Sequence, residues 1–234
     1  MTQPPDDSSD RAGVHNQFKD HRFRARQHRS IGELVEFDSI RSINEPNGPS
    51  ICPLDDTDYL GRVYWITGLS CSGKTTLGRL LCDRLRRSGR ACVQLDGDQL
   101  REAFDNDLGH SFIDRRRSAR RYSGLSRMFA EQGIDVVCST ISLFHDVQTW
   151  NRANIRNYYE IYLRAPLEIL ISRDRKNLYS RALRGEIGNV VGVDLPAEEP
   201  VRPDVIIDND GTHAPAAVLD VILERLGRRE GAAR

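Results

Sequence analysis

Residues 68–75 read GLSCSGKT, in which a glycine and four further residues precede Gly-Lys-Thr. This spacing is the P-loop pattern, where backbone N–H groups surround phosphate oxygens at the start of a helix. The glycines give the loop its turns, the Lys74 amine can reach the β- and γ-phosphates, and the Thr75 hydroxyl can bind Mg²⁺. The motif therefore predicts a site for ATP and Mg²⁺ with these nucleotide-binding residues: Gly68, Leu69, Ser70, Cys71, Ser72, Gly73, Lys74, Thr75 and Thr76.

Two aspartates, Asp96 and Asp98, end the run ACVQLDGD and offer carboxylates for phosphoryl transfer. No lysine-bearing NKxD base reader follows, and LDGD lacks the glycine of a DxxG switch, so a small-molecule kinase is favoured over a switch GTPase. At a strand end, both carboxylates can face the crevice where parallel sheets bind ligands. Asp96 can then help Thr75 to hold Mg²⁺ while Asp98 accepts the proton of an acceptor hydroxyl. The alternative is that both only cap the following helix.

The elements that must position these residues alternate between short apolar strands and amphipathic helices from Arg62 onward. This alternation is typical of a parallel sheet covered by helices. We expect an α/β fold with a five-stranded parallel sheet flanked by helices. The expected strands are residues 63–67, 91–98, 134–141, 158–163 and 204–209; the expected helices are residues 75–87, 115–132 and 147–156, one opened by Pro166, and a closing one with apolar positions at 218–226.

Length and charge limit what else the chain can be. With 234 residues, of which 38% are hydrophobic, it can bury one full core. Lys plus Arg number 34, as do Asp plus Glu, so no global field attracts nucleic acid or an anionic membrane. No apolar stretch approaches the ~20 residues that span a bilayer, and no signal-peptide core is seen, so we expect a soluble cytoplasmic protein. The cysteines lack metal-ligand spacing and predict free thiols: Cys52, Cys71, Cys82, Cys92 and Cys138.

The two ends of the chain lack this alternation. Residues 1–60 begin with polar MTQPPDDSSD and predict a flexible N-terminal extension before a kinase domain at residues 61–228. Residues 229–234 predict a disordered tail. Within the extension, HRFRARQHR is interpreted as a solvated or weakly helical run, with binding to an anionic partner as the alternative. A partner for the extension cannot be named from the sequence.

Several ordered motifs in the chain resemble those of the adenylylsulfate kinase family, whose members phosphorylate the ribose 3′-hydroxyl of adenylylsulfate with ATP. The resemblance covers about residues 62–209 and is carried by GLSCSGKTTL, LDGDQLR, DLGHSFIDRRRSARR, ISLF, RDRKNLYSRALRGEI and VVGVD. It implies the P-loop kinase fold with a lid segment. It also implies ATP and Mg²⁺ as cofactors, a small nucleotide as substrate, and a possible homodimer.

The acceptor-holding motifs of that family match residues throughout this segment. Its DGDxxR and DR motifs correspond to Asp98, Arg101 and Arg115, and guanidinium groups suit an anionic acceptor. Its Ile-Ser pair corresponds to Ile141 and Ser142. We expect Ser142 to hydrogen-bond the acceptor, because direct in-line transfer needs no covalent step; a phosphoserine intermediate is the alternative.

The segment RDRKNLYSRALRGEI, residues 173–187, resembles the mobile lid of the family. The resemblance places Arg173 near the ATP adenine and gives Lys176 a ligand contact. A closing lid would exclude water and stabilise developing charge; an ordinary exposed charged helix is the alternative. Two further expected substrate contacts, Val190 and Val191, stand where the family has a Phe-Thr pair.

The base pocket departs from the family pattern. His110 and Thr140 occupy the positions where two phenylalanines usually sandwich the acceptor adenine, and Ser118 replaces the usual asparagine. Since stacking is worth roughly 1–3 kcal/mol per base, two interpretations stay open. The acceptor is adenylyl sulfate, as the family default, with His110 supplying part of the stacking, and the product 3′-phosphoadenylyl sulfate serves sulfate assimilation. Alternatively, the chain is similar to the branch that phosphorylates cytidine diphosphoramidate in polysaccharide modification. A remote alternative is an ATP-sensing regulatory protein.

Overall fold

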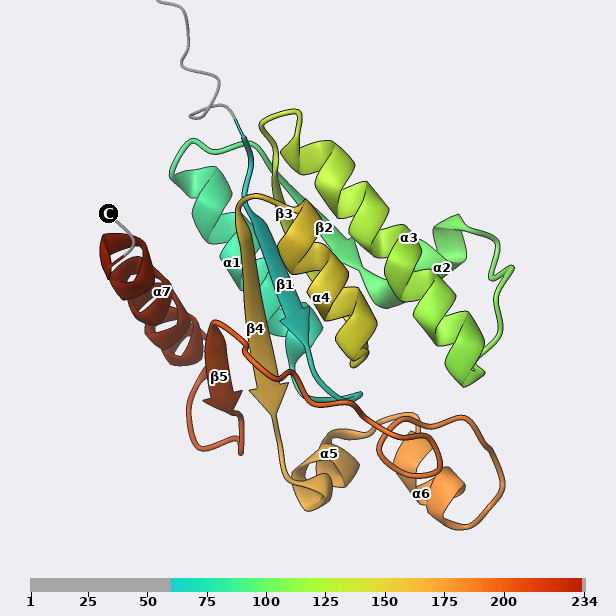
Figure 1. The fold of residues 1–234 in the computed structure, drawn as a ribbon. Helices are drawn as coiled ribbons and strands as arrows, with labels where there is room; N and C mark the ends of the chain where they lie inside the picture. Colours follow the sequence, from blue (N-terminus) through green and yellow to red (C-terminus); the bar gives the residue numbers. More distant parts are fainter. Residues whose placement is uncertain (1–59, 233–234) are drawn as a thin grey trace, which may run out of the picture. The chain divides into compact units, whose positions relative to one another are not determined.

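The computed structural model describes residues 60–232, so the predictions about residues 1–59, including the basic run and Cys52, fall outside it. Five parallel strands form one sheet in the order β2-β3-β1-β4-β5 (Figure 1). The strands are β1 (Val63–Thr67), β2 (Cys92–Asp96), β3 (Asp135–Thr140), β4 (Tyr158–Arg164) and β5 (Val205–Asp208). The predicted five-stranded parallel sheet is confirmed.

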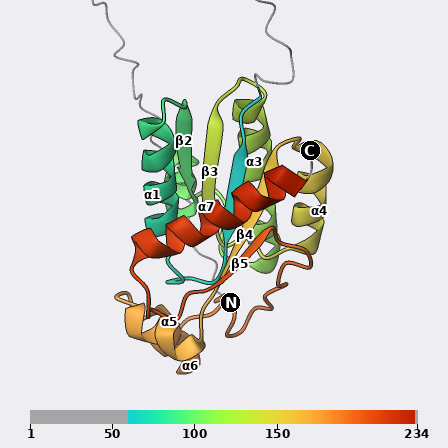
Figure 2. The same ribbon diagram turned by 90° about the vertical axis from the view of Figure 1, so that its left-hand side faces the viewer.

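Helices cover both faces of this sheet (Figures 1 and 2). On one face lie α1 (Lys74–Arg87) and α7 (Pro215–Ala232), and on the other lie α3 (Phe112–Ala130) and α4 (His145–Asn154). The short helix α2 (Gly97–Ala103) follows β2 directly. Two more short helices, α5 (Leu167–Arg173) and α6 (Leu178–Leu183), lie beyond the carboxyl ends of β1 and β4, where the lid segment was expected.

The central strand β1 explains why the sheet needs helices on both faces. All five of its residues are buried. Tyr64 and Ile66 pack with α1 and α7, whereas Val63 and Trp65 pack with α3 and α4. A strand covered on both faces is a continuous apolar run, and this is how VYWIT appears in the sequence. The core thus fixes the carboxyl end of β1, from which the P-loop begins.

Most element boundaries differ from the sequence prediction by one or two residues, helix α4 among them at His145–Asn154 rather than 147–156, and three differences are informative. Helix α3 begins at Phe112 rather than at residue 115, because the Ser111 hydroxyl accepts the Asp114 N–H at 3.1 Å and donates to the Asp114 carboxylate at 2.7 Å. The strand predicted at 91–98 ends at Asp96, since Asp96 caps α2. Helix α7 continues past residue 228, so the predicted tail from 229 is helical as far as Ala232.

Two further findings concern membrane-spanning helices and the cysteines. Within residues 60–232, no helix combines the length and the apolar character that crossing a membrane requires. The four cysteines in this range are free thiols, as predicted: Cys71, Cys82, Cys92 and Cys138.

Candidate active site

The P-loop connects β1 to α1 and is shaped by residues in the left-handed backbone region. Gly68 has a φ of +150° and Gly73 a φ of +96°, and Cys71 adopts +60° without being glycine. A Cβ on Gly68 would lie 2.4 Å from the Leu163 carbonyl oxygen of β4, so only glycine fits there. Such a loop, followed directly by the N-terminus of a 14-residue helix, is typical of an anion-binding nest.

Lys74 is the first residue of α1 and is almost fully buried, with 9% of its surface exposed. Its amine donates to the Leu69 carbonyl oxygen at 2.6 Å, so it spans the loop that it is expected to serve. Burial lowers the pKa of Lys74 to about 8, although Cys71, Asp96 and Asp98 partly oppose this effect. The amine is therefore a cation held where solvent screens it little, which strengthens its interaction with phosphate.

Three polar residues form a line from the P-loop to the end of β2. The Thr75 hydroxyl donates to Asp96 Oδ2 at 2.7 Å, and Asp96 Oδ1 accepts the Asp98 backbone N–H at 3.0 Å. Asp96 thus caps α2 and also accepts a hydrogen bond from Thr75, so capping is not its only contact, and its role toward Mg²⁺ stays a prediction. The Asp98 side chain is exposed and lines a separate cavity.

The hydroxyl and the carboxylate of this line suit Mg²⁺. Thr75 and Asp96 offer two oxygen ligands a hydrogen-bond length apart. Magnesium keeps several waters and usually takes only one or two protein ligands beside substrate phosphates. In the described part of the chain, no group of three or more His, Cys, Asp and Glu side chains forms a dedicated metal cage. The donor set therefore fits a cation that arrives with a nucleotide.

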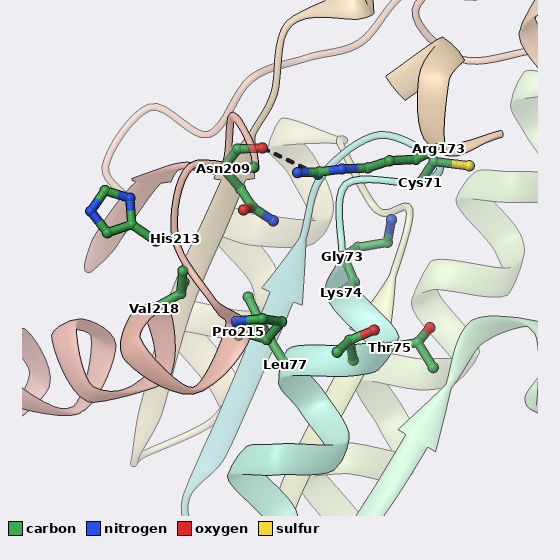
Figure 3. A pocket seen from close by; sticks show the side chains of 12 residues that line it. Cys71, Gly73, Lys74, Thr75, Leu77, Arg173, Asn209, His213, Pro215 and Val218 are labelled. Atoms are coloured by element: carbon green, nitrogen blue, oxygen red, sulfur yellow. Dashed lines mark hydrogen bonds between the residues drawn. The ribbon is translucent and has the colours of Figure 1, made fainter. Parts of the chain in front are cut away.

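A cavity of about 480 Å³ opens beside the P-loop, between it and the start of α7 (Figure 3). Its walls come from the loop and α1, from Arg173 at the end of α5, and from the β5–α7 connection, which contributes His213 and Pro215. The Arg173 guanidinium donates to the Asn209 carbonyl oxygen at 3.2 Å, and the Asn209 side-chain amide donates to the Ser72 carbonyl oxygen at 2.8 Å. Arg173 thus lies beside the P-loop, on the side where the resemblance places the adenine.

A second, smaller cavity of about 50 Å³ lies on the other side of the Thr75–Asp96–Asp98 line. It brings together five of the predicted acceptor residues with three others. Its lining consists of Gly97, Asp98, Arg101, Arg115, Ser118, Tyr122, Thr140 and Ile141. The large cavity is thus lined by P-loop residues, and the small charged one by residues of α2, α3 and the end of β3.

The arginines of the small cavity are hydrogen-bonded to loop carbonyls. Arg101 donates to the Leu108 and Gly109 oxygens at 2.6 and 3.1 Å, and Arg115 donates to the His110 and Asn189 oxygens at 2.9 and 2.8 Å. Burial and the neighbouring Arg101 charge lower the pKa of Arg115. Partial burial and the same two guanidinium groups lower the pKa of His110 below its ordinary value. His110 is therefore a neutral ring near the two arginines at pH 7, able to stack and to hydrogen-bond.

Besides His110, four predicted substrate-contact residues lie outside the lining of both cavities. Ser142 is fully buried, with its backbone N–H 3.3 Å from the Thr67 hydroxyl oxygen. Val190 packs with Leu170 and Tyr179, whereas Val191 packs with a separate apolar cluster. Lys176 is exposed on the turn before α6. The two valines thus form the apolar base of the lid rather than a wall of the acceptor cavity.

Sequence reasoning missed three residues that the structure places at the cavities: Tyr122, Asn209 and His213. Tyr122 was counted only as a core residue of its helix, and it is indeed buried, with 3% exposed. Its position one helical turn after Ser118 is the signal that could have found it, since residues four apart share a helix face. Asn209 and His213 follow the last strand, and no local motif marks them.

Comparisons with known proteins agree with this geometry. A sequence model of the family described as adenylylsulphate kinase matches residues 60–208. The chain is 38% identical over 167 residues to the cytidine diphosphoramidate kinase of Campylobacter jejuni, covering 70% of this chain and 95% of that protein. It is 40% identical over 172 residues to the adenylyl-sulfate kinase of Chloroflexus aurantiacus, covering 74% and 92%.

A solved structure shares the fold. The APS kinase CysC of Mycobacterium tuberculosis, in complex with AMPPNP and APS, superposes with a TM-score of 0.67 at 30% identity, covering 72% of this chain and 98% of that one. The predicted P-loop kinase fold is thus confirmed.

Proposed function

We propose, from the premise that this chain belongs to the adenylylsulphate kinase family, that it transfers the γ-phosphate of ATP to the 3′-hydroxyl of a nucleotide that carries a small anion. One observation carries the proposal. Thr75 lines the large cavity, Asp98 lines the small one, and Asp96 is hydrogen-bonded to both residues. A donor site and an acceptor site thus meet at one line of oxygen ligands, which a phosphoryl transferase requires.

The donor nucleotide would occupy the 480 Å³ cavity with its phosphates on the P-loop. Lys74 would stabilise charge on the transferring group, and Arg173 would lie against the base. Thr75 and Asp96 would hold Mg²⁺, which would supply positive charge to the phosphates of the bound nucleotide. These roles suit a cytoplasmic enzyme that draws on ATP and Mg²⁺.

The acceptor nucleotide would occupy the small cavity. Asp98 would orient the 3′-hydroxyl and accept its proton as the oxygen attacks the γ-phosphorus in line. Arg101 and Arg115 would pair with the phosphate and its attached anion. Ser142 would help to fix the chain that follows β3, because it is fully buried and its backbone N–H donates to the Thr67 hydroxyl oxygen at the end of β1. A direct transfer uses no covalent phosphoserine.

Two acceptors follow from the relatives. Adenylyl sulfate is supported by family membership and by the Chloroflexus aurantiacus relative. Cytidine diphosphoramidate is the second candidate, favoured by a specific observation as well as by the Campylobacter jejuni relative. The lining of the small cavity contains Tyr122 but no pair of aromatic rings, and Thr140 lies in its wall where the family has a phenylalanine.

The test is acceptor-dependent ADP release from ATP and Mg²⁺, with adenylyl sulfate and cytidine diphosphoramidate supplied in parallel. We expect release with at least one acceptor, ³¹P NMR that places the new phosphate on the 3′-oxygen, and no release from Lys74→Ala. ATP binding without any acceptor-dependent release would contradict the proposal and favour an ATP-sensing regulatory protein.

A further inference from the structure

Tyr122 is the largest side chain in the lining of the acceptor cavity, and no role follows for it from the proposed chemistry. It lies on α3 one turn after Ser118 and is 3% exposed. Its hydroxyl donates to the Gly97 carbonyl oxygen at 3.4 Å. Burial raises the pKa of Tyr122 even though a hydrogen bond with Ser118 lowers it, so the hydroxyl keeps its proton. The ring is thus fixed across the cavity, between α3 and the start of α2.

The same residues bound a second hollow. Arg101, Ser118 and Tyr122 line the acceptor cavity of about 50 Å³ and also an adjoining space of about 10 Å³ under the α2–α3 loop. Tyr122 and Ser118 therefore form part of the partition between the two spaces. A smaller side chain at position 122 would join them and add the volume of the lost ring. The ring, rather than the backbone, limits the depth of the cavity on this side.

Thr140 belongs to the same lining and is closely packed. It ends β3 and is 5% exposed. A Cβ added to Gly97 would lie 3.2 Å from the Thr140 hydroxyl oxygen, so the start of α2 is already in close contact with the end of β3. This close packing leaves little room for the cavity to widen between these two elements.

We infer that Tyr122, which lines the cavity together with Thr140, restricts the base subsite to a single-ring nucleobase, so that the acceptor is a pyrimidine nucleotide. The inference rests on the proposed function and decides between its two acceptors. The cavity of about 50 Å³ must widen less to admit one ring than to admit two fused rings. The Ser118, Tyr122 and Thr140 hydroxyls also offer donors and acceptors to the edge of cytosine, which carries both an amino group and a carbonyl.

The experiment compares kcat/KM for cytidine diphosphoramidate and adenylyl sulfate in the full-length protein and in Tyr122→Val. We expect the unsubstituted protein to favour the cytidine compound and Tyr122→Val to lower that ratio by at least about tenfold, since filling or emptying part of a pocket changes discrimination by 10- to 200-fold. The change should come from a lower KM for adenylyl sulfate. Tyr122→Phe keeps the ring and should keep the ratio within about threefold.

A matched control is Tyr64→Phe, which removes a buried tyrosine hydroxyl on the other face of the sheet and should leave the ratio unchanged. Preference of the unsubstituted protein for adenylyl sulfate, or a Tyr122→Val ratio equal to that of Tyr122→Phe, would overturn the inference.

A binding measurement separates failure of the inference from failure of the proposed function. Cytidine and adenosine 5′-monophosphates are titrated by calorimetry while AMPPNP and Mg²⁺ saturate the donor site. Tighter binding of the cytidine nucleotide, lost in Tyr122→Val, supports the base selection even if neither acceptor is phosphorylated. Equal binding of both nucleotides, or tighter binding of the adenosine nucleotide, overturns it even if both acceptors are phosphorylated.

Discussion

The donor and acceptor sides of the P-loop differ in how their polar groups are held. On the donor side, a cavity of about 480 Å³ is bounded by left-handed backbone, a buried lysine and the Asn209 amide. On the acceptor side, about 50 Å³ remains, and both arginines donate to loop carbonyls. Because each guanidinium has five N–H donors, an incoming anion can bind the remaining donors or replace a carbonyl as a partner.

This difference separates a preformed site from one that is completed on binding. A nucleotide triphosphate can enter the donor cavity without displacing an internal hydrogen bond other than that of Lys74 with Leu69. The Arg115 bond to Asn189 ties α3 to the chain just after the lid segment, and an acceptor that takes over this donor would release it. We therefore expect acceptor binding to be coupled to lid movement, whereas donor binding depends mainly on the rigid loop.

The largest effect is expected from the donor side, at Lys74. Lys74→Met removes the cation but keeps the apolar stem, and we expect turnover to fall by about 10³-fold or more. We also expect the nucleotide-free Lys74→Met variant to melt at a higher temperature than the unsubstituted protein. The buried Lys74 amine is charged below its pKa of about 8, and a pKa shift of this size corresponds to a cost in folding free energy on the order of 3 kcal/mol. Calorimetric melting and ADP release test both expectations. Turnover within tenfold of the unsubstituted protein would contradict them.

Asp98 tests the acceptor side at the reacting hydroxyl. Asp98→Asn keeps the shape of the side chain and the backbone N–H that Asp96 accepts, but it removes the proton acceptor. We expect kcat to fall by about 10²- to 10³-fold with ATP affinity unchanged. Steady-state kinetics and ATP titration would show this split. A loss of ATP affinity with unchanged kcat would instead place Asp98 on the donor side.

Arg115 tests whether the acceptor is held by charge. Arg115→Ala should raise the KM for the acceptor by about 10- to 100-fold, because a charge-assisted bidentate contact is lost, and leave the KM for ATP unchanged. Arg116→Ala is the matched control, since the next side chain on α3 is exposed and pairs with Asp146 at 2.9 Å. Equal effects of the two substitutions would mean that a general positive field, rather than a defined contact, attracts the acceptor.

The same comparison explains what the sequence could predict. The donor site is built largely from consecutive residues between a strand and a helix, so the P-loop, Lys74 and Thr75 could be identified from spacing alone. Strands and helices followed from their apolar periodicity, and the errors at Ser111 and Asp96 concern caps. The Asn209 contact with Ser72 joins positions 137 apart and leaves no local pattern.

The acceptor site was predicted in parts. Asp98, Arg101, Arg115 and Ile141 were placed by family motifs and do meet in one cavity. Val190 and Val191 were carried over from the same motifs, but apolar residues at these positions pack into the lid clusters instead of facing a ligand. Tyr122 is the opposite case, since it was predicted as a core residue and also lines the cavity. Apolar periodicity identifies core residues but does not show which of them border a cavity.

The pH dependence sharpens the comparison further. Because the Lys74 amine is protonated below about pH 8, kcat/KM for ATP should fall about fivefold between pH 8 and pH 9 and about tenfold for each further pH unit. Bound triphosphate favours the protonated amine, so kcat should decline only at higher pH. Between the folded pKa and the unfolded value of 10.5, this group makes the free energy of unfolding rise with pH. A kcat/KM profile that stays flat to pH 10 would contradict the assignment.

The smallest effect is expected at Asn209, which holds the donor side together. Its amide donates to the Ser72 carbonyl oxygen at 2.8 Å, while its backbone bonds Arg164 and Arg173 independently of the side chain. Asn209→Ala should therefore raise the KM for ATP by only about fivefold, the value of one hydrogen bond, and leave the acceptor KM unchanged.

Asn209→Asp gives the sharper form of this test. It keeps the shape of the side chain but turns an acceptor toward the Ser72 carbonyl, so the repulsion should make its effect on the KM for ATP larger than that of alanine. Asp208→Asn serves as the control, because the neighbouring carboxylate is exposed and pairs with Arg164 away from the loop. If alanine and aspartate at position 209 instead changed the acceptor KM, the P-loop would transmit strain to both cavities. The donor side would then be no more preformed than the acceptor side.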